Sequence, residues 1–260
     1  MDVLLESEPL PGMAQLVLNR PHIRNALDPE LIARLRDRLA YHAARAQTRV
    51  VVLRATGAAF CAGVELRTMR EQGQSPLADN EADARALAAL FAALRGLPKP
   101  TVVAVQGPTL GAGVGLVAAC DVAIGAEEAK FCLPEVRLGL VPALAAPYLI
   151  EAIGLRQVRR YALSGEMMSA VRAQELGLLH EVVPTLALGG EALRLASDLL
   201  QGGPQALAEC KDLFTRTGLL SAGEQRDVAL ASVLARLRAS AEAQGGLAAM
   251  IARRPPPWAP

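Results

Sequence analysis

Short apolar runs rich in β-branched residues occur at three places in the first half of the chain. They lie at Met13 to Leu18, Arg49 to Ala55 and Thr101 to Gln106. Runs of this length and composition are typical of strands whose two faces are both covered. The pattern therefore predicts three strands, separated by segments with a different period.

The segment after the first run has the period of an amphipathic helix. Asp28 is placed to cap its first turn, and Pro29 suits the first helical position. The residues that recur on one face are Leu31, Ile32, Leu35 and Leu39. The intervening charged positions face solvent, so we expect a helix packed on a sheet.

The second half of the chain is predicted to be mostly helical. Residues 71–80 are polar and predict a mobile surface loop before an Ala-rich helix at about 81–94. Another helical series begins near Pro147, and from Pro204 onward nearly every segment is helical, including about 221–243. On that last segment, one face carries Leu230, Leu234 and Leu237, for packing on the core or on another subunit. The sequence predicts an α/β core with a C-terminal helical appendage.

Composition narrows the class of protein. The 260 residues are 52% hydrophobic and 3% aromatic, with a formal net charge of +1 and scattered arginines, which disfavours nucleic acid as a partner. The N-terminus lacks a signal-peptide pattern, and the longest apolar stretch is too short and glycine-rich to span a membrane. The four cysteines show no metal-ligand or disulfide spacing. We expect a cytoplasmic protein without a metal site.

Two small-residue turns follow two of the predicted strands. They are Phe60 to Leu66 and the glycine-rich run Gly107 to Gly115. A strand that ends in such a turn before a helix presents unpaired backbone N–H groups, and two converging turns would form an oxyanion hole. The alternative is a pair of close-packed turns without a ligand. A dinucleotide fingerprint is disfavoured, because Leu116 stands where its third glycine is needed.

One acid lies in an apolar segment beyond the second turn. Glu135 follows Leu133 and Pro134 and precedes Val136. Partial shielding from water raises the pKa of a carboxyl group and suits it for proton transfer. The alternative is a surface acid paired with Arg137. Together with an oxyanion hole, the acid indicates chemistry on a polarised carbonyl.

These features together resemble the crotonase superfamily, the enoyl-CoA hydratase/isomerase family, from about residue 3 to the end. The matching segments are Leu18 to Pro21, Asn25 to Leu27, Phe60 to Gly63, Gly107 to Gly115, Cys120 to Ala123, Pro134 with Glu135, Leu138 to Leu140, Gly177 to Val183 and Arg253 to Trp258.

The resemblance implies an α/β spiral of ββα turns in residues 1–200 and a C-terminal helical oligomerisation region in residues 201–260. It implies an acyl-CoA thioester as substrate, a homotrimer or dimer of trimers, and no cofactor apart from the coenzyme A of the substrate. The thioester oxygen would be bound by the backbone N–H groups of Ala62 and Ala112. Substrate contacts carried over from the family are His22, Ile23, Arg24, Ala62, Gly63, Val64, Glu65, Leu66 and Gly111. Arg253 or Arg254 is a candidate for CoA phosphate.

The chain departs from the two-acid hydratases of the family at Gly115, where those enzymes carry a glutamate. Glycine carries no proton, so Glu135 is left as the single acid. The segments around Gly115, Glu135 and Tyr148 resemble bacterial glutaconyl-CoA hydratases of leucine and acyclic terpene breakdown, which share the glycine. Their substrates carry a distal carboxylate, for which Arg137, Arg67 and Arg70 are candidates.

The resemblance therefore implies a hydratase that adds water across the 2,3 double bond of a branched enoyl-CoA, such as 3-methylglutaconyl-CoA. Glu135 would move the proton while Ala62 and Ala112 stabilise the enolate. One alternative is a single-acid enoyl-CoA isomerase. Another is a catalytically silent scaffold of the same fold.

Overall fold

The computed structural model describes residues 2–217 and 223–259. A six-stranded sheet forms its centre, with the strand order β1-β2-β3-β4-β6-β9. The first pair is antiparallel, and all later neighbours in this sheet are parallel. The strand bounds are β1 Leu4–Ser7, β2 Met13–Leu18, β3 Val50–Ala55, β4 Thr101–Val105, β6 Val122–Ala126 and β9 Glu181–Val183.

A second, three-stranded sheet lies beyond the ends of the central strands. It has the order β5-β7-β8, formed by Pro108–Leu110, Lys130–Cys132 and Met168–Ser169. Its strand β5 continues the chain from β4 after a two-residue connection, so the glycine-rich run, which begins at Gly107 in that connection, passes through this small sheet. The three strands predicted from the apolar runs are confirmed to within one residue at each end.

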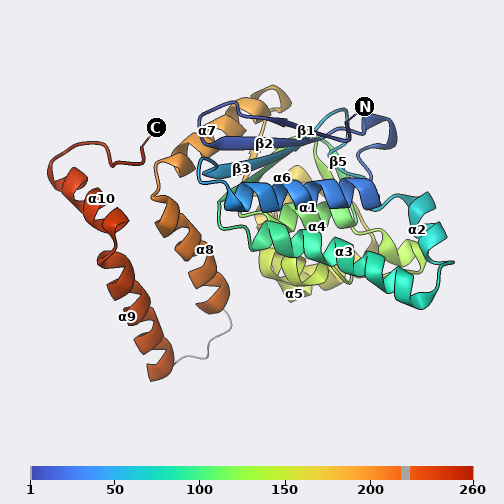
Figure 1. The fold of residues 1–260 in the computed structure, drawn as a ribbon. Coiled ribbons are helices and arrows are strands. Elements are labelled where there is room, and N and C mark those ends of the chain that lie inside the picture. Colours follow the sequence, from blue (N-terminus) through green and yellow to red (C-terminus); the bar gives the residue numbers. More distant parts are fainter. Residues whose placement is uncertain (1, 218–222, 260) are drawn as a thin grey trace.

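Helices cover both faces of the central sheet (Figure 1). On one face of the sheet, residues of β3 and β4 such as Leu53 and Val103 pack in a core cluster with α1, α3, α4 and α5. Their alternate neighbours, such as Val52 and Val102, pack against α7 in a second cluster. The helices are α1 Pro29–Ala44, α2 Leu66–Gln72, α3 Leu77–Arg95, α4 Ala112–Ala119, α5 Ala146–Ser164, α6 Ala170–Leu176, α7 Leu188–Leu200, α8 Pro204–Thr217, α9 Glu224–Arg238 and α10 Ala241–Ile251, with short 3-10 turns η1 Pro21–Ile23, η2 Glu135–Leu138 and η3 Thr185–Ala187.

Helix α1 begins as predicted, because the Asp28 carboxylate accepts a hydrogen bond of 2.9 Å from the Leu31 N–H. The predicted surface loop over 71–80 is only partly correct. Helix α2 extends to Gln72, and α3 already begins at Leu77, directly after Pro76. A proline favours the start of a helix, since its missing N–H is not needed there. The polar composition of 77–80 therefore belongs to an exposed first helical turn.

The C-terminal helices extend away from the sheet (Figure 1). The predicted helix over 221–243 is interrupted, because Ser240 caps a new helix by accepting from the Ala243 N–H; residues 221 and 222 lie outside the described part. No described residue of α9 is buried, and Leu234 is 57% exposed. The leucine face of α9 is therefore not packed in the core of its own chain. No helix of the described residues is long and apolar enough to cross a membrane.

Candidate active site

The two small-residue turns lie against each other. Cys61 forms a parallel bridge with Thr109, and the Leu110 N–H donates to the Cys61 carbonyl at 2.9 Å. A methyl group placed on Gly63 would lie 2.9 Å from the Leu110 oxygen and 3.5 Å from the Ala112 nitrogen. The convergence expected from the sequence is present, because hydrogen bonds join segments almost fifty residues apart.

The structure corrects the expectation for Ala62. Its N–H donates to the Arg24 carbonyl at 2.9 Å, so this group already has an acceptor. Gly63 and Glu65 both bond to Leu27, through a carbonyl and an N–H respectively. Since backbone groups alternate along an extended segment, the Val64 N–H between them points away from Leu27.

The N–H groups of Val64 and Ala112 are the candidate donors of an oxyanion hole. Neither N–H has a hydrogen-bond acceptor among residues 2–217 and 223–259. Ala112 is the first residue of α4, where no acceptor within the helix is available. The two donors thus combine an extended turn with a helix N-terminus. Sequence reasoning named Val64 only as a substrate contact, because the partner of Ala62 lies in a distant loop.

Glu135 lies next to the second turn. It begins η2, and a methyl group on Gly111 would lie 2.9 Å from its Oε1. Gly111 has φ of +50°, a conformation that side chains rarely adopt, so glycine permits this close approach. Burial raises the pKa of the Glu135 carboxyl group. Its Oε2 is buried and has no hydrogen-bond partner in the described structure.

Arg137 does not pair with Glu135. Its guanidinium donates to the Ser164 carbonyl at 3.2 Å, and its side chain covers Gly165. Within the described ranges, no Lys, Arg or His side chain forms an ion pair with Glu135. The reading of Glu135 as a surface acid paired with Arg137 is therefore wrong in this structure.

Gly115 marks the position of the missing second acid, and apolar groups fill the space beside it. A methyl group there would lie 2.7 Å from the Phe91 Cζ and 2.9 Å from the Ala145 Cβ. The Phe91 ring is fully buried and meets the Tyr148 ring edge to face, with centroids 5.7 Å apart. A side chain at residue 115 would therefore require Phe91 and Ala145 to shift.

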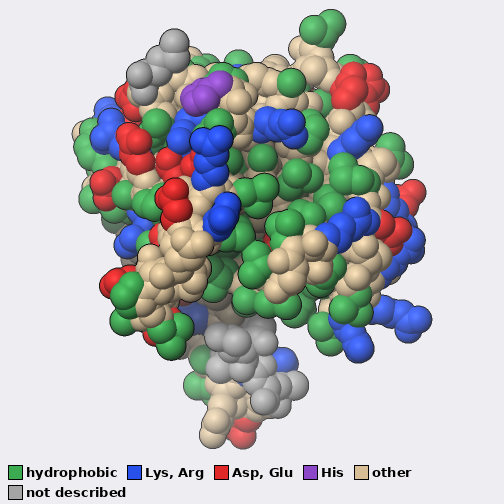
Figure 2. All heavy atoms as spheres, turned by 90° about the vertical axis from the view of Figure 1, so that its right-hand side faces the viewer, with side chains coloured by type: hydrophobic (Ala, Val, Ile, Leu, Met, Phe, Trp, Pro, Cys, Tyr) green, Lys and Arg blue, Asp and Glu red, His purple; other side chains and the backbone are tan. Residues whose placement is uncertain are grey.

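The other candidate substrate contacts lie around the first turn. His22 and Ile23 belong to η1, and Arg24 follows with φ of 54° while its carbonyl holds Ala62. Leu66 begins α2 and is 63% exposed. Figure 2 shows the face that carries α2 and the beginning of α3, where apolar side chains gather and basic side chains lie beside them. Such a surface suits a ligand with apolar and anionic parts.

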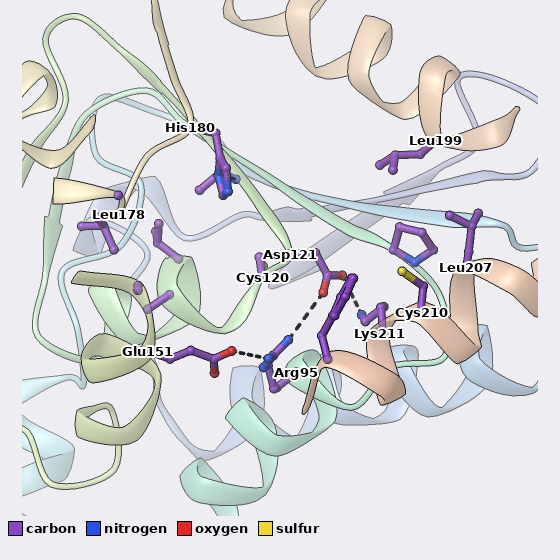
Figure 3. Close-up of a pocket in the computed structure, with 17 residues that line it drawn as sticks. Arg95, Cys120, Asp121, Glu151, Leu178, His180, Leu199, Leu207, Cys210 and Lys211 are labelled. Carbon is purple, nitrogen blue, oxygen red and sulfur yellow. Dashed lines mark hydrogen bonds and ion pairs between the residues drawn. The ribbon is translucent and has the colours of Figure 1, made fainter. Parts of the chain in front are cut away.

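A cavity of about 500 Å³ lies elsewhere, between α8 and the core (Figure 3). Its charged groups satisfy one another. Asp121 accepts from Lys211 at 2.6 Å, and Arg95 pairs with Glu151 and lies 3.9 Å from Asp121. None of the candidate catalytic residues lines this cavity. The ion pair between Lys211 and Asp121 joins α8 to the core beside this cavity, which lies apart from the two turns and Glu135.

The layered α/β architecture, two backbone donors without acceptors in the described structure and one shielded acid are an arrangement that suits enzymes that stabilise an oxyanion while moving a proton. The chain belongs to the enoyl-CoA hydratase/isomerase family, whose model matches residues 10–260. It is an enzyme of this family, of the hydro-lyase class, and it has the mixed α/β crotonase fold with C-terminal helices.

Individual relatives match over nearly the whole chain. A putative enoyl-CoA hydratase of Thermus thermophilus is 33% identical, over 94% of this chain and 96% of the relative. A 2,3-dehydroadipyl-CoA hydratase of Escherichia coli is 34% identical, over 93% and 92%. The crystal structure of an enoyl-CoA hydratase from Shewanella pealeana superposes with a TM-score of 0.95 at 36% identity, covering 99% of this chain and 96% of that one.

The packing at Gly115 gives a stability prediction. Gly115→Ala should lower the free energy of unfolding by about 1 to 3 kcal/mol, because the methyl group overpacks the Phe91 ring. Adding Phe91→Leu should recover part of the loss. Urea denaturation of the single and double variants measures this. Gly190→Ala is the control, since it lies in α7 with nothing within 4 Å and should stabilise slightly. Additive losses in the double variant would contradict the packing explanation.

Proposed function

We propose that this protein hydrates the 2,3 double bond of a branched glutaconyl-CoA. The observation that supports the proposal is the position of Glu135, whose buried, unpartnered Oε2 lies beside the turn that presents Ala112. A carboxylate and an oxyanion hole in this arrangement suit addition of water to a polarised thioester. Coenzyme A enters as part of the substrate, and we propose no further cofactor.

The proposed step uses Val64, Ala112 and Glu135. Water oxygen bonds to C3 while the π electrons move to the thioester oxygen, where the Val64 and Ala112 N–H groups stabilise the enolate. Glu135 accepts a proton from the water and transfers it to C2, as the enolate returns its electrons to carbon. Glu135 ends in its starting state, and the water is added to one face. Branching at C3 stabilises positive character there and reduces the need for a second acid.

A distal carboxylate on the substrate calls for a cation. The 2,3-dehydroadipyl-CoA hydratase of Escherichia coli is named for an acyl group that likewise ends in a carboxylate. The Arg137 side chain donates to the Ser164 carbonyl, whereas the side chains of Arg67 and Arg70 on α2 form no hydrogen bond or ion pair with other described residues. We therefore favour Arg67 and Arg70 over Arg137 for this contact.

Isomerisation is the second candidate function. A single acid suffices to move one proton between allylic carbons, and the packing at Gly115 leaves only Glu135. The same donors would stabilise the intermediate dienolate. The two functions differ in whether water is incorporated.

Product analysis distinguishes the proposals. The protein is incubated separately with 3-methylglutaconyl-CoA, crotonyl-CoA and a 3-enoyl-CoA. We expect a product 18 mass units heavier than the substrate, formed fastest from 3-methylglutaconyl-CoA. Chromatography with mass spectrometry measures this. A shifted double bond without added water would replace hydration by isomerisation, and no turnover of any thioester would favour the scaffold reading. Faster hydration of crotonyl-CoA would contradict the branched substrate.

Glu135→Gln tests the proton carrier, because it keeps the volume and removes the acid. We expect kcat for hydration to fall by about 100-fold or more. In the wild type, the carboxylate is the active form, so activity should be lost as pH falls through a pKa raised above the usual glutamate range. Steady-state kinetics across pH measure both effects. Glu127→Gln, an exposed acid, is the control, and near wild-type turnover of Glu135→Gln would remove Glu135 from the mechanism.

We propose assembly into a homotrimer or a dimer of trimers through the C-terminal helices. Helices α9 and α10 expose Val228, Leu234, Leu247, Met250 and Ile251. Apolar faces of this extent favour burial against another copy. Light scattering should give three or six times the chain mass of 27.3 kDa, and Leu234→Glu should reduce it. A monomeric wild type would contradict the proposal.

A further inference from the structure

Asn25 is a fully buried amide between the η1 loop and the first turn. Its Nδ2 donates to the Thr56 carbonyl at 2.8 Å and to the Ala59 carbonyl at 2.9 Å. Its Oδ1 accepts from the Arg20 N–H at 2.7 Å. All three hydrogen bonds of the Asn25 side chain are therefore made to backbone groups.

Gln106 contacts the same turn from the end of β4. Its Nε2 lies 3.2 Å from the Ala55 carbonyl and 3.1 Å from each of the Gly57 and Ala59 carbonyls. Ala59 therefore accepts from two side-chain amides, one from each of two segments. Gln106 directly precedes the glycine-rich run, so its amide connects this run to the turn that follows β3.

The carbonyls that these amides hold lie just before Val64, and Gln106 lies just before Ala112. Asn25 also follows Arg24, whose carbonyl takes the Ala62 N–H. Without an amide donor, carbonyls in this turn would lose a partner, and a buried carbonyl such as that of Ala59 is destabilised when it is left without one. Relaxation of the turn toward other donors would move the segment that carries Val64.

We propose that Asn25 and Gln106 are positioning residues that fix the spacing between the Val64 and Ala112 N–H groups. The inference rests on the proposed function of these groups as an oxyanion hole. Such donors act because their geometry is set before the reaction, and a displacement of about 1 Å can cost about 100-fold in rate. Neither amide touches the substrate in this role.

Isosteric variants remove the donors and keep the volume. Asn25→Asp retains the acceptor for Arg20, whereas Gln106→Glu turns an acceptor toward three carbonyls. The probe is 4-dimethylaminocinnamoyl-CoA, whose absorption moves to longer wavelength when its thioester carbonyl is polarised. We expect a red shift on binding to the wild type, and a smaller shift with either variant at saturating probe.

Kinetics supply a second measurement. For Gln106→Glu, kcat should fall about 10 to 100-fold while KM changes less than about threefold, because the oxyanion develops only in the transition state. Thr48→Val is the matched control. It removes the 2.9 Å contact between the Thr48 hydroxyl and buried His42, which forms no hydrogen bond with Asn25 or Gln106. This variant should lower the unfolding temperature without changing the red shift.

The outcomes separate the inference from the function on which it rests. No red shift with the wild type would contradict the oxyanion hole itself. A wild-type shift that Asn25→Asp and Gln106→Glu reproduce in full would overturn the positioning role. An equal loss of the red shift or of kcat in Thr48→Val would also overturn it, since that result indicates general destabilisation. If Asn25→Asp does not fold, Gln106→Met provides the second variant, because its half-buried position tolerates an apolar chain.

Discussion

The direct backbone contact between residues 60–63 and 108–112 is the constraint on which the site depends. It joins the segment after β3 to the small sheet and brings Gly63, the residue before Val64, close to the start of α4. The contact requires small residues, because a methyl group on Gly113 would lie 2.6 Å from the Cys61 carbonyl. Glu135 then reaches the same place through β7, which pairs with β5. One interface between two turns thus sets the positions of both donors and of the acid.

The sequence was informative where the signal is local. The strands at residues 13–18, 50–55 and 101–105 follow from apolar runs, and α1 follows from its Asp28 cap. It was less informative for Ala62 and Val64. Which N–H remains without an acceptor depends on Arg24 and Leu27, more than thirty residues earlier. Spacing within one turn carries no information about such partners. The sequence also failed to predict the end of α9 before Ser240, because the residues on both sides of this serine have a helical pattern.

Gly115 was identified from the sequence as a missing acid, but its surroundings were not. Phe91 lies in α3 and Ala145 is the N-cap of α5, and only the packing of these elements against α4 shows that they occupy the space. Their presence changes the meaning of the glycine. The position is a packed apolar contact, so the chain is built around one acid, and a glutamate could not be accommodated there without rearrangement of the core.

A site with one acid places a larger share of the chemistry on the backbone donors. Where two carboxylates lie together, each raises the pKa of the other; here burial alone raises the pKa of Glu135. No other ionisable side chain of the described residues forms a hydrogen bond or ion pair with its carboxylate. In the mechanism that we propose, Val64 and Ala112 therefore have to stabilise the enolate strongly, and backbone N–H groups do so through fixed geometry. The amides of Asn25 and Gln106 together hold four carbonyls of one short turn, and in our proposal they supply that rigidity without adding charge to the site.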